Sequence, residues 1–282
     1  MQNTPPSPAR LSVSIVLHNS PLDRLGRVLD CLERAGRAAV AKGLLDGVAV
    51  ELVDNASGSD YRAALSREME ARPAGGAVAF ECRFLAENRG FGAGHNAALA
   101  SASSEFHLVL NPDAELAPDA LIKGLSRLAA DPGLALLSPM AVGASGQREF
   151  LCKRYPSVLV LLLRGFAPAW MCRVFDGRLA HYEMRDACGG DAAVHVEIAS
   201  GCCMLARTGA LRDVGGFDET FFLYFEDFDL SLRLADRGGL LFEPAMRIVH
   251  HGGYTAEKGW RHLGWFLRSA LRFFNRHGWR WL

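Results

Sequence analysis

The sequence of 282 residues has no long hydrophobic run, no C-x-x-C pair and no excess of either charge. Its longest apolar run, residues 158–163, is closed by Arg164 and is far shorter than the roughly 20 residues of a membrane-spanning helix. Because the seven cysteines are odd in number, we expect neither a disulfide framework nor a structural zinc site, and a reducing cytoplasm is favoured. Lys+Arg and Asp+Glu are both 31, so nothing global indicates a nucleic-acid ligand.

The two ends of the chain also lack particular residue types. Residues 1–10 are rich in proline and have no apolar centre, so we expect a disordered tail there rather than a signal peptide. After Glu257 there is no acid, and the remaining charged residues are basic. Half of all residues are hydrophobic, which is enough to build a large core in one or two domains.

Strand-like and helix-like segments alternate over the first half of the chain. Hydrophobic periodicity predicts strands at 11–17, 48–53, 78–85, 106–110 and 134–137, and helices at 21–42, 59–70, 97–102 and 118–130. Such alternation predicts an α/β fold in which a mostly parallel sheet is flanked by helices on both faces.

The alternation breaks after residue 140. Residues 141–193 hold the apolar run, Trp170 and several Gly and Pro, so we expect an irregular or helical insert. The later pattern predicts a strand at 194–205, a helix at 227–237, a short strand at 240–242 and a terminal helix at 260–277. We therefore expect one domain over 11–257, divided into 11–140, 141–193 and 194–257, followed by an amphipathic helix within 258–282.

Polar residues follow the ends of several predicted strands. The strand at 106–110 runs into Asn111-Pro112-Asp113-Ala114-Glu115, and the first two strands end in His18-Asn19-Ser20 and Asp54-Asn55. Ligands of open α/β sheets bind just past the carboxyl ends of the strands. Acids in that place suit a hard divalent cation that holds phosphate oxygens, and Asp113 with Glu115 is the first pair to consider. The alternative is an ordinary set of turns and helix caps.

Residues 88–96 form a glycine-rich segment between a predicted strand and a predicted helix. Its three alternate glycines would let backbone N–H groups approach a ligand closely, at a helix start that favours anions. Arg89 could pair with a phosphate there. The spacing is neither a G-x-G-x-x-G fingerprint nor a Walker loop. A flexible loop without a ligand is the alternative.

Two late clusters carry further candidate chemistry. Glu226, Asp227 and Asp229 lie among aromatic residues at a predicted helix start, where the macrodipole keeps acids ionised. An ionised carboxylate in an aromatic cleft can act as a general base, whereas a plain N-terminal charge cluster has no such role. His250 and His251 precede two glycines, and a histidine there with Asp113 would make a mixed N/O site for Mn2+ or Mg2+. A structural histidine is the alternative.

In this order and spacing the motifs resemble those of the inverting family-2 glycosyltransferases, which have the A-type nucleotide-sugar fold. The rhamnosyltransferase-like members are the most similar. The resemblance runs from Val13 to about His277, and includes the Lys-Arg-Tyr-Pro-Ser motif at 153–157, residues 201–206 and the Gly-Gly-Phe-Asp-Glu motif at 215–219.

The resemblance implies roles for individual residues. It implies that Asp227 is the general base and that Asp113 and His250 hold Mg2+ or Mn2+. The implied nucleotide-sugar contacts are His18, Asn19, Asp54, Asn88, Arg89, Gly90, Asn96, Asn111 and Asp113. The implied acceptor or supporting residues are Arg154, Gly201, Glu226 and Asp229. Asn111 replaces the first Asp of the Asp-x-Asp motif and brings no charge, while Glu115 becomes a bystander at the start of the next helix.

The implied activity is metal-dependent, inverting sugar transfer from a nucleotide-diphosphate sugar. The resemblance favours dTDP-L-rhamnose as donor and a lipid-linked or cell-surface glycan as acceptor, at the inner face of the cell membrane. Galactose, galactofuranose or N-acetylglucosamine donors, or a non-catalytic nucleotide-sugar-binding protein, are the alternatives. A nucleotidyltransferase would need a basic loop after the first strand, which is absent. The basic and aromatic terminal helix predicts peripheral membrane contact, or else packing on the domain, and residues 158–166 could form a second docking surface.

Overall fold

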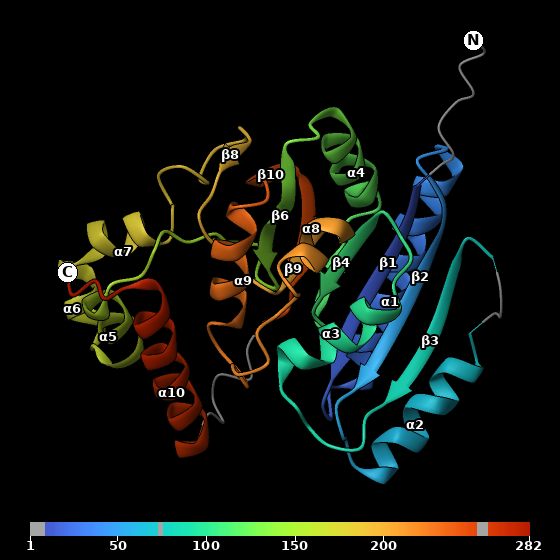
Figure 1. The fold of residues 1–282 in the computed structure, drawn as a ribbon, viewed down its shortest axis with the longest axis horizontal. Helices are drawn as coiled ribbons and strands as arrows, with labels where there is room; N and C mark the ends of the chain where they lie inside the picture. Colours follow the sequence, from blue (N-terminus) through green and yellow to red (C-terminus); the bar gives the residue numbers. More distant parts are fainter. Residues whose placement is uncertain (1–8, 73–75, 253–258) are drawn as a thin grey trace.

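The computed structural model describes residues 9–72, 76–252 and 259–282. Within these ranges the chain forms one ten-stranded sheet with helices on both faces (Figure 1). Its main path runs β3-β2-β1-β4-β9-β6-β10-β5. Most of the predicted 1–10 tail, and Gly253 of the predicted His-His-Gly-Gly turn, lie outside the described residues, whereas Ala9 and Arg10 already belong to the first strand.

One half of the sheet is purely parallel. β1 (Ala9–Leu17) pairs with β2 (Leu45–Asp54) on one side and β4 (Phe106–Leu110) on the other, and β3 (Val78–Phe84) pairs with β2. All five residues of β4 are buried, as a continuous apolar run in a covered sheet predicts. The predicted α/β fold with a mostly parallel sheet is confirmed, and these strands end together at one edge.

The other half of the sheet is mixed and differs from the sequence prediction. The predicted strand at 194–205 is two strands, β8 (Val194–His195) and β9 (Cys203–Arg207), and β9 lies antiparallel between β4 and β6 (Leu134–Gly143). The predicted three-residue strand is the twelve-residue β10 (Gly239–His250), parallel to β6. Its register shifts between Glu243 and Arg247, so the irregular middle hides its length from pattern analysis.

Two short strands complete the edge next to β10. β5 (Ala114–Leu116) pairs with the end of β10, and β7 (Arg148–Glu149) pairs with β6. Glu115 therefore lies in a strand and not at the start of a helix, which corrects the sequence prediction. The next helix, α4 (Ala120–Ala130), begins four residues after β5 ends.

Helices cover the sheet in two layers. α1 (Leu22–Ala41), α2 (Ser59–Glu70) and α4 pack on one face, where α1 buries a stripe that includes Leu25, Leu29 and Leu32. α3 (Phe91–Ser101), α8 (Thr208–Asp213) and α9 (Glu226–Ala235) cover the other face.

The start of α3 corrects another prediction, because the helix begins six residues before the predicted 97. Gly92 and Gly94 lie so close to Phe217 and Val16 that an added Cβ would be 2.7 Å from either side chain. Close packing therefore offsets the low helix propensity of glycine.

The predicted helical insert is present as three short helices. α5 (Val158–Phe166), α6 (Ala169–Val174) and α7 (Asp176–Tyr182) lie together at the end of the molecule farthest from β3, beside α10 (Trp260–His277) (Figure 1). The backbone N–H groups of Val158 and Leu159 donate to the carbonyls of Arg280 and Trp281, so the end of the chain is joined to α5. In the described part of the chain no helix is long and apolar enough to span a membrane.

Candidate functional site

The carboxyl ends of β1 and β2 are joined by polar contacts. The backbone N–H of Asn19 donates to Ser57 Oγ at 2.8 Å, and Asn19 Oδ1 accepts from the Gly58 N–H at 3.1 Å. His18 Nδ1 lies 3.0 Å from the Asn55 carbonyl oxygen, and its side chain is exposed. The two predicted strand-end clusters therefore meet, as adjacent parallel strands require.

Asp54 is fully buried at the end of β2. Its Oδ2 accepts from Arg62 Nε at 2.6 Å and from the Ser57 N–H at 3.2 Å, whereas its Oδ1 is buried without a hydrogen-bond partner. A buried acceptor with no partner is costly, so Oδ1 is free to receive a ligand N–H or hydroxyl.

The glycine-rich segment is built as a tight turn followed by α3. Asn55 holds this turn to β2, since its Nδ2 donates to the Gly90 carbonyl at 2.9 Å and its Oδ1 accepts from the Arg89 N–H at 3.0 Å. Asn88 Oδ1 accepts from the Gly90 N–H. Gly90 has φ 93° and a Cβ there would lie 2.2 Å from the Phe222 carbonyl oxygen, so only glycine fits.

Two of the predicted nucleotide contacts have protein partners instead. Asn96 donates to the Phe217 carbonyl and to Glu219 Oε1, and accepts from the Phe217 N–H. Arg89 forms an ion pair with Glu219, with Nη2 and Oε2 2.5 Å apart. The structure therefore places Asn96 and Arg89 around Glu219, which fixes the 216–219 turn against α3.

The predicted metal ligands Asp113 and His250 lie together, although they are far apart in sequence. The antiparallel pairing of β5 with β10 places His250 Nε2 3.7 Å from Asp113 Oδ1. Asp113 Oδ1 and Asn111 Oδ1 are both buried without a hydrogen-bond partner. An oxygen and a nitrogen at this separation can share one ion at ligand distances of about 2.1 Å.

Two acids outside the predicted metal site pair with the histidines: Glu149, which sequence reasoning missed, and Glu115, which it set aside as a bystander. Glu149 on β7 has Oε2 2.7 Å from Nδ1 of His250, and Glu115 has Oε1 2.9 Å from Nε2 of His251 and 3.0 Å from Arg27 Nε. Glu149 has no sequence signal, because the strand pair β6–β7 that brings it to His250 is a tertiary feature. A carboxylate on the second ring nitrogen is the usual way to orient a metal-binding histidine.

Asp227 lies at the first turn of α9, and both its oxygens accept backbone hydrogen bonds. Oδ2 accepts from the Gly201 N–H at 2.9 Å and Oδ1 from the Phe228 N–H at 3.0 Å. Cys202 follows Gly201, and its backbone carbonyl accepts a hydrogen bond from the Asn111 N–H at 2.9 Å. Residues 201–202 therefore bridge the Asp227 carboxylate to the Asn111–Asp113 turn.

Burial changes the ionisation expected from the helix macrodipole. Burial raises the pKa of Asp227 above its ordinary value, and the N–H groups of Gly201 and Phe228 oppose the rise. Burial and the neighbouring Asp227 carboxylate raise the pKa of Glu226 well above its usual range, and Glu226 Oε2 has no hydrogen-bond partner. Of the two, Asp227 is better able to hold the negative charge.

The remaining predicted supporting residues lie elsewhere. Asp229 is fully buried and faces α10, with Oδ1 2.8 Å from His277 Nε2 and Oδ2 2.7 Å from Arg233 Nε. Arg154 pairs with Asp186 within the insert, at 2.9 Å. Its neighbour Lys153 is the cation whose charge acts on Asp227, and burial lowers the pKa of Lys153 to about 8. Side chains of adjacent residues in an extended segment point to opposite sides, so Lys153 and Arg154 have different surroundings. The motif at 153–157 includes both residues, and Lys153 could have been selected from it.

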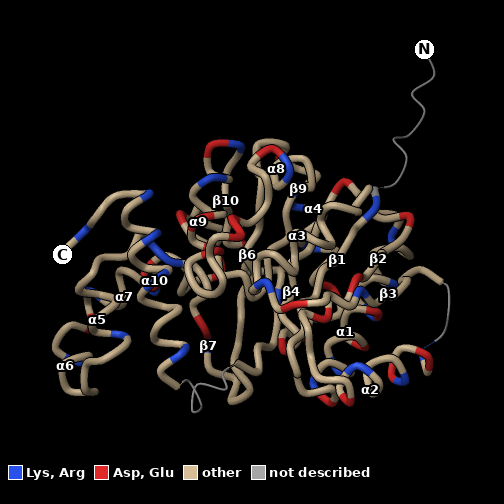
Figure 2. Tube along the Cα trace, turned by 60° about the horizontal axis from the view of Figure 1, so that its bottom comes forward, with Lys and Arg blue, Asp and Glu red and all other residues tan. Residues whose placement is uncertain are grey.

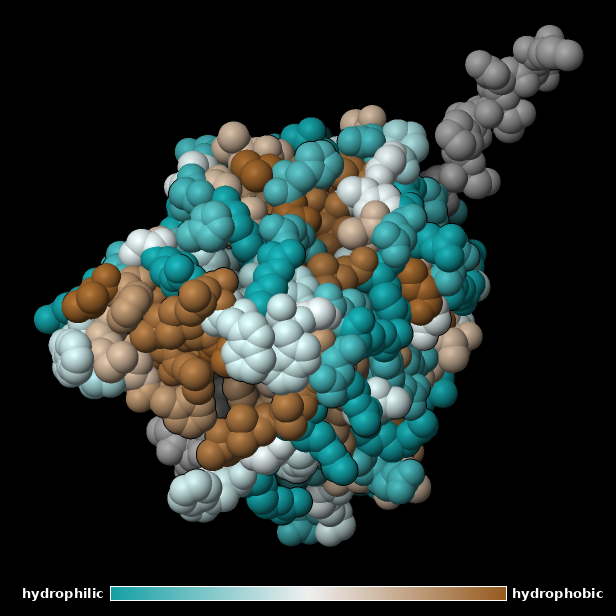
Figure 3. Space-filling view, turned by 60° about the vertical axis from the view of Figure 1, so that its left-hand side comes forward, coloured by the Kyte–Doolittle hydropathy of each residue, from teal (hydrophilic) through white to brown (hydrophobic). Residues whose placement is uncertain are grey.

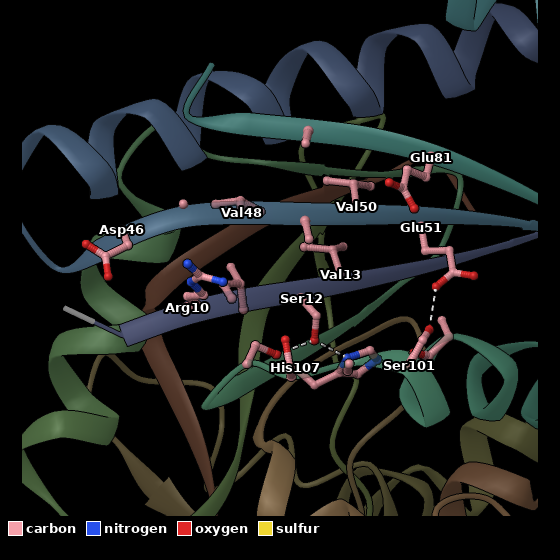
Figure 4. Close-up of a pocket in the computed structure, with 18 of the residues that line it drawn as sticks. Arg10, Ser12, Val13, Asp46, Val48, Val50, Glu51, Glu81, Ser101 and His107 are labelled. Carbon is pink, nitrogen blue, oxygen red and sulfur yellow. Dashed lines mark hydrogen bonds between the residues drawn. The ribbon is translucent and has the colours of Figure 1, made fainter. Parts of the chain in front are cut away.

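Two hollows differ in their relation to these residues. A cleft of 640 Å³ contains Glu226 and Asp227 and is walled by α5 and α10. A second hollow lies over the amino-terminal parts of β1 and β2, away from the strand ends (Figure 4). There Ser12 is bonded to His107 at 2.7 Å and Ser101 to Glu51 at 3.1 Å (Figure 4).

Comparison with known families gives a match over most of the chain. The family model described as Glycosyl transferase family 2 matches residues 12–215. The chain belongs to glycosyl transferase family 2. The predicted family is confirmed.

Two curated relatives of this chain are rhamnosyltransferases. It is 31% identical over 185 residues to the N-acetylglucosaminyl-diphospho-decaprenol L-rhamnosyltransferase of Mycobacterium tuberculosis, a match covering 61% of this chain and 56% of the relative. It is 25% identical over 197 residues to the rhamnosyltransferase WbbL of Escherichia coli, covering 66% of this chain and 70% of the relative. The chain thus spans little more than half the length of the mycobacterial protein.

Solved structures share the fold of this chain. The mannosyltransferase PcManGT of Pyrobaculum calidifontis, in complex with GDP-Man and Mn2+, has a TM-score of 0.62 and 21% identity, over 95% of this chain and 66% of that one. GalNAc-T7, with UDP, GalNAc and Mn2+, has a TM-score of 0.64 and 15% identity, over 96% of this chain and 48% of that one. The central sheet and its two helix layers are therefore those of the A-type glycosyltransferase fold.

Proposed function

We propose that this glycosyltransferase is metal-dependent and inverting, and that it moves L-rhamnose from dTDP-L-rhamnose to a hydroxyl of a lipid-linked or cell-surface glycan. The observation that supports this most is the two-residue bridge 201–202. It joins the Asp227 carboxylate, through the Gly201 N–H, to the Asn111–Asp113 turn, through the Cys202 carbonyl. A base and a diphosphate site held by adjacent residues suit a single displacement at a sugar carbon.

Asp113 and His250 would hold a divalent cation, Mg2+ or Mn2+. The unpartnered Oδ1 of Asp113 and the closely placed Nε2 of His250 fit such an ion, and a carboxylate with one imidazole leaves the other positions to donor phosphates and water. When bound, the ion supplies positive charge that stabilises the departing nucleotide diphosphate. The Mn2+ in the structural relatives PcManGT and GalNAc-T7 is in keeping with this assignment.

Asp227 acts in the proposal as the general base. Its carboxylate, fixed by two backbone N–H groups, accepts the proton of the acceptor hydroxyl as the oxygen attacks the anomeric carbon from the side opposite the diphosphate. The configuration at that carbon is inverted. The free Oδ1 of Asp54 receives the nucleotide base, and Asn88 and Gly90 shape the loop around the nucleotide.

The donor and the acceptor are proposed from the relatives. Both curated relatives named above are rhamnosyltransferases, and the name of the mycobacterial one describes a lipid diphosphate acceptor. We further propose that this chain acts on the cytoplasmic face of the cell membrane as a peripheral protein. Galactose, galactofuranose or N-acetylglucosamine donors would use the same site geometry and are compared with rhamnose in the test.

The substitution Asp227→Asn tests the proposal. We expect transfer to fall by about 10²–10⁴-fold, the usual contribution of a general base. The rise in melting temperature with dTDP-L-rhamnose and Mn2+ should persist, because the donor site is unchanged. Asp23→Asn, in the exposed part of α1, is the matched control and should leave both readouts unchanged. Undiminished transfer by Asp227→Asn would exclude Asp227 as the base, and a larger thermal shift with another sugar nucleotide would change the donor.

A further inference from the structure

The insert helices α5 and α6 carry a row of exposed apolar side chains. Leu162, Phe166, Trp170 and Val174 follow one another at intervals of four and are 52%, 57%, 65% and 71% exposed. We call these four residues the insert stripe. Figure 3 shows hydrophobic residues gathered around a hollow on the side of the molecule where these helices lie. Contiguous apolar surface of this kind marks a binding face.

The insert stripe is not needed for the packing of the insert itself. The opposite sides of these helices form a small core of Val160, Leu163, Leu179 and Tyr182, which Phe228 joins to α9. The exposed side chains can therefore be buried against another surface without unfolding the insert.

Basic side chains outnumber acidic ones around the stripe. Residues 150–175 include no Asp or Glu, and Arg164, Arg173 and Arg178 are exposed. The acids nearest to the stripe in the sequence form ion pairs, Asp176 with Arg185 and Glu183 with Arg164, so Arg173 and Arg178 carry most of the positive charge on this face. Figure 2 shows Lys and Arg, in blue, on this side of the molecule along the insert helices and α10. An apolar row with basic flanks complements an anionic lipid surface.

The stripe borders the cleft that contains the proposed base. Phe166 and Arg164 on α5 line one wall of the 640 Å³ cleft and Phe266 on α10 lines the other, with Asp227 between them. A surface that receives the insert stripe would therefore lie beside the opening through which an acceptor reaches Asp227.

α10 is a weaker candidate for this role, although the sequence predicts it. Phe273 and Phe274 are buried, Arg272 donates to the Thr220 carbonyl, and Arg276 pairs with Asp218. Two of its basic residues, Arg272 and Arg276, thus stabilise the contact of α10 with the domain.

We propose that the insert stripe docks on an anionic bilayer, with Phe166 and Trp170 in the interface and Arg164, Arg173 and Arg178 at the headgroups. The cleft with Asp227 then opens at the membrane surface, where a lipid-linked acceptor presents its polar head. This inference rests on the proposed function only for the nature of the acceptor.

Flotation of the full chain with vesicles of phosphatidylglycerol and phosphatidylcholine tests the docking. We expect binding that weakens as salt is raised and is largely lost with phosphatidylcholine alone. The double variant Trp170→Ser, Val174→Ser, which leaves the lining of the cleft intact, should lower the bound fraction at least tenfold. The pair Leu267→Ser, Leu271→Ser, on exposed positions of α10, is the matched control and should bind within twofold of the unchanged chain.

Several outcomes would overturn the docking. They are a lack of vesicle binding, equal binding by the insert variant, a greater loss with the α10 pair, and concentration-dependent self-association that depends on Trp170 and Val174. Transfer to a water-soluble acceptor separates this inference from the proposed function. If the insert variant loses vesicle binding and retains soluble transfer, the docking stands. If the unchanged chain binds vesicles but transfers no sugar to any acceptor, the proposed function alone fails.

Discussion

Glu226 and Asp227 are neighbours at the start of α9, yet their surroundings differ. Asp227 accepts two backbone hydrogen bonds, whereas Glu226 is 5% exposed and its Oε2 accepts none. Hydrogen bonds from N–H groups stabilise the charged form of a carboxylate. Burial without such hydrogen bonds favours the neutral, protonated form. The pair therefore suits one charged and one neutral carboxyl group, with Glu226 as the neutral member.

This difference predicts the effect of pH on Glu226→Gln. The pKa of Glu226 is raised in the folded state, so its contribution to stability is complete below the unfolded pKa and is lost as pH rises from there through the folded pKa. Gln cannot ionise. We therefore expect Glu226→Gln to match the unchanged protein in urea unfolding near pH 4 and to be more stable at pH 7.5. A variant less stable at pH 7.5 than the unchanged protein would contradict a raised pKa of Glu226 in the folded state.

Glu149 illustrates a positioning residue that only the tertiary structure reveals. Its contact with His250 Nδ1 directs Nε2 toward Asp113. We expect Glu149→Gln to weaken Mn2+ binding by about 10–100-fold, the usual effect of losing such a partner. Titration calorimetry with Mn2+ measures this without activity. Glu70→Gln, on α2, is the control, and unchanged affinity in Glu149→Gln would remove the positioning role.

At the scale of elements, α10 is held to α9 by a buried charge. Asp229 lies against His277 and Arg233, and Arg276 Nη1 lies 3.2 Å from its Oδ1. Removing the Asp229 charge would leave the positive charges of its partners without a neutralising carboxylate. A helix that ends in this cluster therefore depends on tertiary contacts as much as on its own sequence.

We expect Asp229→Asn to lower the free energy of unfolding by about 3–5 kcal/mol, the cost of breaking a buried ion pair. Amide hydrogen exchange should rise along α10 more than in β1. Asp236→Asn, at the exposed end of α9, is the control and should change stability little. Equal exchange in α10 of both variants would mean that aromatic packing alone holds the helix.

At the scale of the whole molecule, a buried polar chain crosses the sheet. Ser12 and Ser14 bind the two ring nitrogens of His107 at 2.7 and 2.8 Å, and Ser14 also binds His95. Burial, with the charge of Arg212, lowers the pKa of His107 to about 4. The folded protein therefore keeps this ring neutral at pH values where the unfolded chain protonates it.

The consequence is loss of stability in acid. Because the folded pKa is lowered, stability is complete above the unfolded pKa of 6.5 and falls as pH drops through that value toward about 4. The shift corresponds to roughly 3 kcal/mol from His107, at about 1.36 kcal/mol per pKa unit. Urea unfolding at pH 7 and pH 5 should show the fall, and His107→Gln should reduce it. The exposed His195→Gln is the control, and an undiminished fall in His107→Gln would assign the effect to other groups.

The local pattern predicts most of the fold's parallel half. The helix at 59–70, the strand at 106–110 and the helix at 260–277 have the predicted bounds, because each depends on a periodic run of apolar residues. β10 does not follow the prediction, since its middle is irregular, and α3 does not, since its glycines are helical only through close packing. Neither the register shift in β10 nor the close packing of the α3 glycines can be predicted from the local sequence pattern.

The sequence by itself determined the family, the strand ends and the residue types that a transfer site needs. Asp113, Asp227 and His250 stood out by their positions after strands, at a helix start and beside glycines, and the resemblance to the family gave them their expected roles. The tertiary structure decided their partners: Glu149 beside His250, Lys153 rather than Arg154 near Asp227, and Asp229 at α10. Those contacts depend on strand pairing and helix packing between residues far apart in the chain, and local periodicity carries no information about either.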